Sequence, residues 1–249
     1  MLKRSDLYKI FENYNATRSR LYEEGAPAKD YGFRVTSGTS GKEPLFRIAY
    51  YPGHFIPRFK DARRSVLLFG SKYTQLLNLL FFTKDEKLDD SQALVLEAKD
   101  LNTKLGPILS EFAPEKLVGF PSFIRKAVES IPKELPLPIH TIFLVGELYT
   151  KELEGVLKNR FPGVRVITHY ANSEIGGIGA SCDQLKKNQY HPIRGVELLI
   201  AAPNKEGVGE LVVSRKGGDL EFENYYTGDY ARLLREKCAC GKSHSFEVI

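Results

Sequence analysis

The chain has 249 residues, of which 42% are hydrophobic and 27% are charged. This length allows one large domain, or a domain with a small appendage, and the composition supplies an ample core. The net charge of +5 is scattered, and the densest basic group, Arg58 to Arg64, has no nucleic-acid-binding motif beside it. We therefore expect a solvated helix face at this group and no nucleic-acid partner.

The cysteines and the apolar runs bear on where the protein resides. Three cysteines cannot pair completely, and two of them lie in Cys238-Ala239-Cys240, so a reducing compartment fits better than a disulfide framework. The longest apolar run, Leu76 to Phe82, is far shorter than the roughly 20 residues of a membrane span. No apolar region follows Met1 to Asp6, as it would in a signal peptide. We predict a cytoplasmic protein without a membrane segment.

Short helical and strand patterns alternate along the first three quarters of the chain. Helices are predicted at 5–14, from about 54, at 102–112, from 121 and at 150–161, and strands at 34–35, 45–50, 77–82, 93–97, 117–120, 140–145 and 164–170. Because each run is short and bounded, we predict an α/β fold with a mixed sheet core and helices on both faces. Beyond Pro192 the helical period disappears, and strands are predicted at 196–201, 210–214 and 230–234. The expected domains are therefore an α/β core over 1–190 and a smaller β-rich subdomain over 191–249.

A loop rich in glycine and hydroxyl groups joins the first two predicted strands. It reads Thr36, Ser37, Gly38, Thr39, Ser40, Gly41, Lys42, Glu43 and Pro44. Glycines let backbone N–H groups approach an anion closely, hydroxyls add donors and the lysine adds positive charge, so the loop suits a phosphate. It is not a Walker A loop, which has wider glycine spacing and a Ser or Thr after the lysine. The alternative is an ordinary hairpin loop.

Three further stretches place polar residues at strand ends, where open α/β sheets have their ligand crevices. In His169 to Gly177, the carboxylate of Glu174 could hold Mg²⁺ beside a nucleotide phosphate. Val145 to Leu148 combines a glycine with an acid, and the aspartate of Tyr226 to Asp229 could accept two hydrogen bonds from a ribose diol. Each stretch alone is also compatible with a simple turn.

Taken together and in this order, the stretches resemble the motifs of the adenylate-forming superfamily, which includes acyl-CoA synthetases, luciferases and the adenylation domains of peptide synthetases. The loop at 36–44 is similar to the phosphate loop of that family, Tyr170 to Glu174 to its Tyr-Gly-x-Ser/Thr-Glu motif, and Tyr226 to Asp229 to its Thr-Gly-Asp motif. Leu117 to Ser122 and the closing Cys-x-Cys-Gly-x-x-His resemble the phenylacetate–CoA ligase-like branch. The resemblance runs from about Leu2 to the last residue.

The resemblance implies a role for each matching residue, and the core over 1–190 would bind the nucleotide. The β- and γ-phosphates of ATP would lie in the loop formed by Thr36, Ser37, Gly38, Thr39, Ser40, Gly41 and Lys42. The catalytic residues would be Thr39, Lys42 and Glu174, of which Glu174 also anchors Mg²⁺. The rest of the nucleotide would contact Gly146, Glu147, Leu148, Tyr170, Ala171, Asn172, Ser173 and, at the ribose, Asp229. The acyl pocket would be approached by Phe120, Pro121 and Ser122. Ala171 stands where the family usually has glycine.

The implied reaction is attack of a carboxylate on the α-phosphate of ATP, which gives an acyl adenylate and pyrophosphate. Relatives continue into a C-terminal lid whose lysine stabilises this step, whereas this chain stops at Ile249 and also starts late compared with them. Losing such a charge commonly costs about 10²- to 10³-fold in rate. Three alternatives follow: an enzyme that adenylates slowly or takes its lid from another polypeptide, an ATP- or acyl-adenylate-binding module without turnover, and a fragment of a longer ligase.

The resemblance also limits the partners. A small carboxylic acid is the expected substrate, and aryl, fatty and amino acids all stay open. The acceptor could be coenzyme A, a carrier protein or an amine, and a separate lid protein and a homodimer are further expected partners.

A last set of residues suits a structural metal. Cys182, His191, Cys238 and Cys240 would make a four-ligand zinc site that ties the β-rich tail to the nucleotide crevice. His244 is the competing nitrogen ligand, and the alternative is three unrelated thiols.

Overall fold

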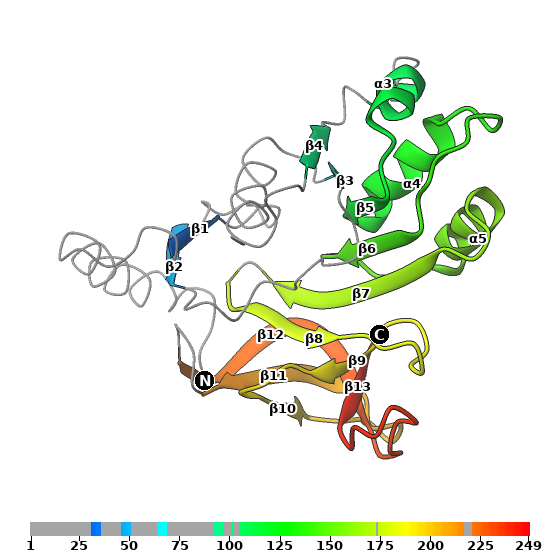
Figure 1. The fold of residues 1–249 in the computed structure, drawn as a ribbon. Helices are drawn as coiled ribbons and strands as arrows, with labels where there is room; N and C mark the ends of the chain where they lie inside the picture. The colour runs from blue at the N-terminus through cyan, green and yellow to red at the C-terminus, as the bar shows by residue number, and fades with distance from the viewer. Residues whose placement is uncertain are drawn as a thin grey trace. The chain divides into compact units, whose positions relative to one another are not determined.

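The computed structural model describes residues 31–35, 46–50, 64–68, 92–96, 101, 105–172, 174–216 and 221–249 (Figure 1). The chain divides into two compact units, one formed by Met1–Tyr51 with His169–Ile249 and the other by Pro52–Thr168. Each unit has its own cluster of buried apolar side chains. Strand β7 (Arg165–Asn172) begins in the second of these units and ends in the first.

The Pro52–Thr168 unit contains a parallel sheet with the strand order β4-β3-β5-β6, next to which β7 begins. Its strands are β3 (Arg64–Leu68), β4 (Gln92–Leu96), β5 (Lys116–Gly119) and β6 (Thr141–Val145). Three helices alternate with them: α3 (Leu105–Phe112), α4 (Pro121–Ser130) and α5 (Lys151–Arg160). In Figure 1 these helices lie together beside β5 and β6, and α4 contacts both α3 and α5. Because β5 is buried along its whole length, its sequence reads as a continuous apolar run after Lys116.

The helix ends follow from local sequence. Thr150 caps α5 by accepting a hydrogen bond from Leu153 N at 3.2 Å. Acidic residues occupy the first turn of α5 and basic residues its last turn, which complements the helix dipole. In α4, Pro121 occupies the first turn, where its missing N–H leaves no hydrogen bond unmade. These signals explain why the predicted starts of both helices are confirmed.

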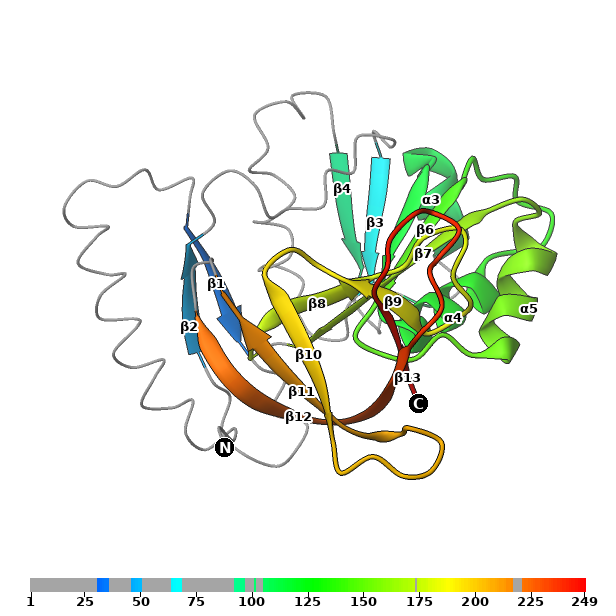
Figure 2. The ribbon, with the colours of Figure 1, turned by 90° about the horizontal axis from the view of Figure 1, so that it is seen from below.

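The other unit is antiparallel and β-rich (Figure 2). Its strands follow the order β10-β11-β12-β13-β9-β8, and the end of β7 pairs with β8. Their bounds are β8 (Gly176–Ala180), β9 (Gln189–Pro192), β10 (Val196–Ala201), β11 (Gly209–Arg215), β12 (Phe222–Leu234) and β13 (Ser245–Val248). A separate hairpin pairs β1 (Tyr31–Val35) with β2 (Phe46–Tyr50), with Val35 opposite Phe46. The pairing of antiparallel strands beyond residue 190 agrees with the loss of helical period there.

The predicted α/β fold with a mixed sheet is confirmed, and two local expectations are corrected. Arg64 begins strand β3 rather than lying on a helix face, because the run Ser65 to Leu68 is taken into the parallel sheet. The last long strand starts at Phe222, eight residues before the predicted start at Tyr230. The predicted helices at 5–14 and near His54, the strand at 77–82 and the loop at 36–44 lie outside the described residues.

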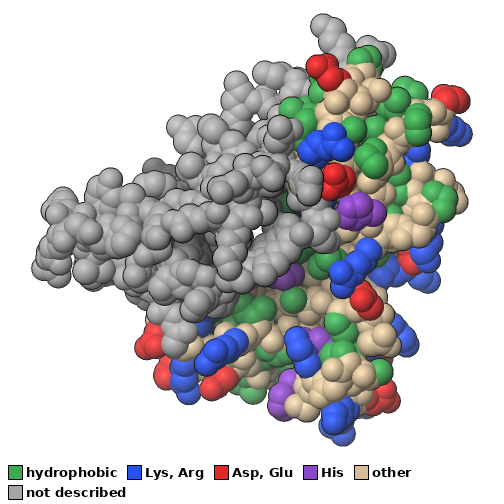
Figure 3. Space-filling view, in the orientation of Figure 1, with side chains coloured by type: hydrophobic (Ala, Val, Ile, Leu, Met, Phe, Trp, Pro, Cys, Tyr) green, Lys and Arg blue, Asp and Glu red, His purple; other side chains and the backbone are tan. Residues whose placement is uncertain are grey.

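Two surface observations concern partners. Among the described residues, no helix has both the length and the hydropathy needed to cross a bilayer. On the face shown in Figure 3, the described Lys and Arg side chains are interspersed with acidic and other polar side chains. This distribution on that face agrees with the scattered charge of the sequence.

Candidate nucleotide site and metal centre

Tyr170 and Asp229, which belong to two separate motifs of the sequence, form a direct hydrogen bond. The Tyr170 hydroxyl donates to Asp229 Oδ2 at 2.5 Å across 59 residues of sequence. Burial and the neighbouring Asp229 carboxylate raise the pKa of the Tyr170 phenol, so the phenol stays protonated and acts as the donor. The ring of Tyr170 packs on Tyr190 and Phe246, with centroids 5.8 Å away in each case. The two predicted nucleotide-contacting residues are thus joined by a hydrogen bond, and the ring of one of them, Tyr170, is held by packing on two other aromatic rings.

The Thr-Gly-Asp motif is a bulge in β12. Tyr226 lies opposite Val212 and Tyr230 opposite Glu210, so the chain between them contains more residues than the facing strand. Gly228 adopts φ +82°, a conformation that favours glycine. The Thr227 hydroxyl donates to Leu211 O at 3.0 Å and accepts from Asp229 N at 3.1 Å. The bulge therefore fixes the exposed carboxylate of Asp229 toward Tyr170.

The rest of the Tyr170 motif forms the turn from β7 to β8. Ala171 and Asn172 lie at the end of β7, and Asn172 pairs with Gly176 in the register. The Asn172 side chain accepts a hydrogen bond from Ile175 N at 2.8 Å, which closes the turn. Glu174 lies in this turn and is half-buried, whereas Ser173 lies outside the described residues.

In the other unit, the predicted acyl segment and the Gly-Glu-Leu turn are in contact. Ser122 donates from its backbone N and from its hydroxyl to the two carboxylate oxygens of Glu147, each at 2.8 Å. No side-chain cap comes from Phe120, the N-cap residue of α4, so Glu147 supplies an acceptor to the helix start from a distant segment. Leu148 is 41% exposed and Pro121 is buried.

Gly146 is required where it stands. Its φ of +83° favours glycine, and a Cβ built on it would lie 2.6 Å from the ring of Phe120. The Phe120 ring thus packs on the backbone of Gly146, next to Glu147, which accepts the hydrogen bonds from Ser122. Residues of both predicted segments form one packed corner at the ends of β5 and β6.

The phosphate-loop residues Thr36 to Lys42, including Thr39 and Lys42, lie outside the described residues. The two strands predicted on either side of them are present and pair antiparallel, and Val35 lies opposite Phe46 at the two ends of the loop. The assignment of these residues to phosphate binding stays a prediction.

Four potential metal ligands converge in the β-rich unit. One ligand atom from each of Cys182, His191, Cys238 and Cys240 lies within 4.8 Å of the others. The Sγ atoms of Cys182 and Cys238 are 3.7 Å apart, and His191 Nε2 lies 3.5 Å from Cys182 Sγ and 3.2 Å from Cys240 Sγ. Tetrahedral zinc with ordinary bond lengths requires about 3.8 Å between sulfurs and about 3.5 Å between sulfur and nitrogen. The three measured separations are close to those values.

The second nitrogen of His191 orients the ring. His191 Nδ1 lies 2.7 Å from His244 O, so Nδ1–H donates to this carbonyl and Nε2 is free to act as a ligand. His191 is only 1% exposed, and the turn of the Cys-x-Cys segment is closed by hydrogen bonds between Cys238 and Gly241 and between Cys238 and Lys242. His244 therefore contributes its backbone carbonyl to this cluster, and His191 contributes the ring nitrogen.

No protein-family model and no curated protein matches the sequence. Solved structures match the fold. An open conformation of 2-hydroxyisobutyryl-CoA ligase in complex with 2-HIB-AMP and CoA has a TM-score of 0.67 at 11% identity, over 99% of this chain and 58% of that one. A benzoate CoA ligase from Burkholderia xenovorans LB400 has a TM-score of 0.60 at 15% identity, over 90% of this chain and 49% of that one. VinN in complex with L-aspartate has a TM-score of 0.57 at 17% identity, over 90% and 64%.

The chain has the fold of the adenylate-forming ligases. It spans 49 to 64% of the length of these three structures. Within this fold, the Tyr170 and Thr-Gly-Asp motifs meet through a hydrogen bond, and the Gly146 turn meets the Phe120 segment.

Two contacts were not anticipated from the sequence. The pairing of Glu147 with Ser122 spans 25 residues, and no local pattern signals it. The role of the His244 carbonyl is likewise not predicted by the sequence, which suggests only the side chain of His244 as a metal ligand. The spacing Cys-x-Cys-Gly-x-x-His places this residue just after a tight turn, which is the one available signal.

Proposed function

We propose that this chain binds ATP and activates a carboxylic acid as its acyl adenylate. A carboxylate oxygen attacks the α-phosphorus of ATP, and the bond from this phosphorus to the bridging oxygen of pyrophosphate breaks. Glu174 would hold Mg²⁺, which neutralises phosphate charge when bound. Coenzyme A is the proposed acceptor of the acyl group, and a phenylacetate-like aryl acid is the first substrate to test.

The observation that carries the proposal is the hydrogen bond between Tyr170 and Asp229. The sequence resemblance assigns Tyr170 to the adenine and Asp229 to the ribose, so both must lie within one nucleoside length of each other. The hydrogen bond meets this requirement. It also orients the Asp229 carboxylate by a donor that stays protonated, which is what a preorganised ribose contact needs.

The length of the chain favours a second candidate. Because the chain spans 49 to 64% of the matching structures, a nucleotide-binding module, or a piece of a longer ligase, is the alternative to a self-sufficient enzyme. The two candidates share ATP binding and differ in turnover.

Exchange of labelled pyrophosphate into ATP tests the proposal, with a panel of aryl, fatty and amino acids and with or without a lid protein added in trans. We expect acid-dependent exchange that falls at least about tenfold in Asp229→Ala. Glu223→Ala, an exposed acidic residue on the same strand, is the matched control and should leave exchange unchanged. ATP binding with background exchange under all conditions would reject the enzyme and leave the binding module.

We further propose that the Cys182, His191, Cys238 and Cys240 cluster is a structural zinc site. All four positions of a tetrahedral ion are taken by protein ligands, so the site is closed and suits a structural rather than a catalytic ion. The ion would join two segments 56 residues apart, around Cys182 and Cys238.

Metal analysis of the purified chain tests the site. We expect about one equivalent of zinc, its loss in His191→Ala and its retention in His244→Ala, because His244 contributes only its backbone carbonyl. Thermal unfolding should shift to lower temperature in chelator for the parent chain. Less than about half an equivalent of zinc, with unfolding unchanged in chelator, would refute the proposal.

A further inference from the structure

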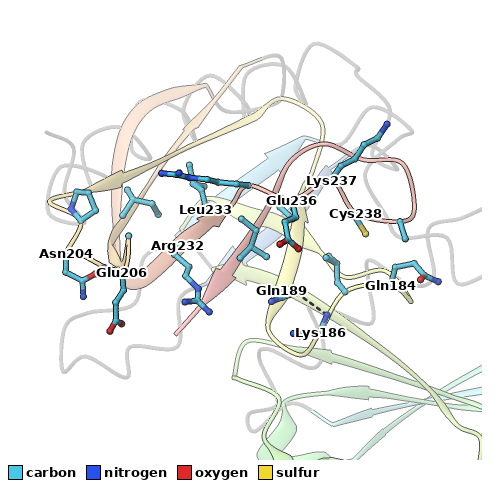
Figure 4. A pocket seen from close by; sticks show the side chains of 18 of the residues that line it. Gln184, Lys186, Gln189, Asn204, Glu206, Arg232, Leu233, Glu236, Lys237 and Cys238 are labelled. Carbon is cyan, nitrogen blue, oxygen red and sulfur yellow. Dashed lines mark hydrogen bonds between the residues drawn. The ribbon is translucent and has the colours of Figure 1, made fainter.

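A groove in the β-rich unit lies apart from the residues assigned to the nucleotide. It has a volume of about 1200 Å³ and runs between the turn after β10, the end of β12 with the loop that follows it, and the loop before β9 (Figure 4). We call it the β10–β12 groove. Neither Tyr170 nor Asp229 lines it, so the proposed reaction does not account for it.

Part of the lining of the β10–β12 groove is apolar. Ile200, Leu233, Leu234 and Leu185 line it, and Leu233 is 48% exposed. Isolated exposed apolar residues are common on protein surfaces and do not indicate a binding site. A large apolar side chain that is exposed inside a groove is a stronger indication of one. Burying it would supply part of the free energy of association with a partner.

The walls of the groove are cationic. Five Lys and Arg residues line it, against the two acids Glu206 and Glu236. Arg232 is already paired with Glu247, with 2.6 Å between Nη2 and Oε2. The side chains of the other four cations are exposed and form no ion pair with any residue that the structure describes: Lys186, Lys205, Arg235 and Lys237.

The walls are ordered by hydrogen bonds that do not involve these cations' side chains. The Asn204 side chain accepts from the backbone N of Glu206 and of Val208, at 2.9 and 3.0 Å, which fixes the turn that carries Lys205. Gln189 Oε1 accepts from Lys186 N at 3.2 Å in the opposite loop. The remaining wall contains Cys238, whose Sγ lies 3.7 Å from Cys182 Sγ, so the proposed zinc ion would join this wall to the loop after Cys182. The side-chain charges thus project from fixed backbones.

We propose that the β10–β12 groove docks an acidic amphipathic helix of a partner protein. Apolar lining residues, together with unpaired cations on the surrounding segments, complement a helix with one apolar face flanked by Asp and Glu. A nucleic-acid duplex presents charged phosphates and keeps its bases stacked inside, so it would leave Leu233 and Leu185 uncovered. The groove therefore favours the helix. Binding is independent of ATP, so this proposal stands or fails separately from the proposed enzyme activity.

Fluorescence anisotropy of a labelled 18-residue peptide, with leucines on one helical face and glutamates on the other, tests the docking on the metal-loaded full chain. We expect saturable binding that weakens at least about tenfold in Lys205→Glu/Lys237→Glu, whose charges come from the turn after β10 and the loop after β12. Lys133→Glu/Lys151→Glu changes the net charge equally at exposed positions of the other unit and should leave the affinity within about twofold. Leu233→Asn should also weaken binding about tenfold, and a scrambled peptide of the same composition should bind poorly.

Three results would overturn the docking proposal. The first is the absence of saturable binding below about 100 µM peptide. The second is an equal loss in both charge variants, or equal binding of the scrambled peptide, which would indicate attraction to net charge alone. The third is tighter binding of a single-stranded oligonucleotide, or of vesicles containing anionic phosphatidylglycerol, with no effect of Leu233→Asn. Circular dichroism of each variant confirms that it is folded.

Discussion

The hydroxyl of Tyr170 lies 2.5 Å from Oδ2 of Asp229 and joins the end of β7 to the bulge in β12. Because burial keeps the phenol protonated, the pair is a charge-assisted hydrogen bond from a neutral donor to a carboxylate. Asp229 is exposed, so water competes for its other lone pairs and limits the net energy of the bond.

Removing this hydrogen bond should cost little stability but show clear coupling. We expect Tyr170→Phe to lower the free energy of unfolding by about 1 kcal/mol, since the ring packing on Tyr190 and Phe246 is kept. In a double-mutant cycle with Asp229→Asn, measured by urea unfolding, the second substitution should cost less in the Phe background. Strict additivity would mean that the two side chains do not interact.

The contact between Glu147 and Ser122 should stabilise the start of α4. Glu147→Ala leaves the Ser122 N–H without its acceptor, and we expect a loss of about 1–2 kcal/mol in unfolding free energy. Glu129→Ala, which removes an exposed ion pair with Arg125 at the other end of the same helix, should cost at most about 0.5 kcal/mol. Equal costs for the two variants would argue against the capping role of Glu147.

Gly146→Ala should be strongly destabilising, by about 2–4 kcal/mol, because the new methyl meets both a positive φ and the Phe120 ring. Gly155→Ala is the matched control. Gly155 lies inside α5 with open space around its Cα, and alanine there should stabilise the protein by about 0.5–1 kcal/mol. Chemical unfolding of both variants measures the contrast. Adding Phe120→Leu to Gly146→Ala should restore the part of the unfolding free energy that is lost through the clash with the ring. If nothing is restored, the whole loss is due to the positive φ of the backbone.

His169 should make stability depend on pH. Burial lowers the pKa of His169 to about 4, below the value of about 6.5 in an unfolded chain. The unfolded state therefore binds more protons between these values, and stability falls as the pH is lowered from about 6.5 to about 4. We expect the free energy of unfolding to fall by about 1–3 kcal/mol between pH 6.5 and pH 4. The lower figure is favoured because the His169 side chain is only half-buried.

Comparison with His169→Gln isolates this effect, since protonation of the cysteine and histidine cluster affects both proteins equally. Unfolding free energies at pH 7 and pH 5 should differ less in the variant than in the parent chain. Identical pH profiles would show that His169 titrates normally in the folded protein.

The sequence predicts the parts of this fold whose signals are local. Helices α4 and α5 begin where Pro121 and Thr150 indicate, and the fully buried β5 reads as an apolar run. The start of β12 was missed because Asn224 and Gly228, both with positive φ, interrupt the alternation on which strand prediction depends. The sequence predicts a helix at Arg64 because its charged neighbours mask the short apolar run of β3.

For the site, residue types and their order in the chain indicate the candidate side chains. They could not show that Glu147 binds Ser122 rather than solvent, since this depends on the parallel register of β5 and β6. Nor could they decide between the two histidines near the Cys-x-Cys turn, because the choice depends on which one the β9 strand buries.

The irregularities of β12 bear on how the chain tolerates insertions and deletions. In the pairing of β12 with β11, Phe222 lies opposite Arg215 and Tyr225 lies opposite Val213. The two aromatic residues are three positions apart on β12, whereas their partners are two positions apart on β11, so β12 contains one extra residue here. Because the strand bulges at this extra residue, both aromatic rings reach the same core.

Shortening the strand by one residue near Asn224 would leave the two aromatic residues two positions apart, and in a regular strand such residues point to the same face. Both rings could therefore still reach the core without the extra residue. Straightening the strand with all its residues kept would instead place these two residues three positions apart on opposite faces, so one ring would leave the core. A single deletion near Asn224 should therefore be less damaging than loss of the bulge at constant length.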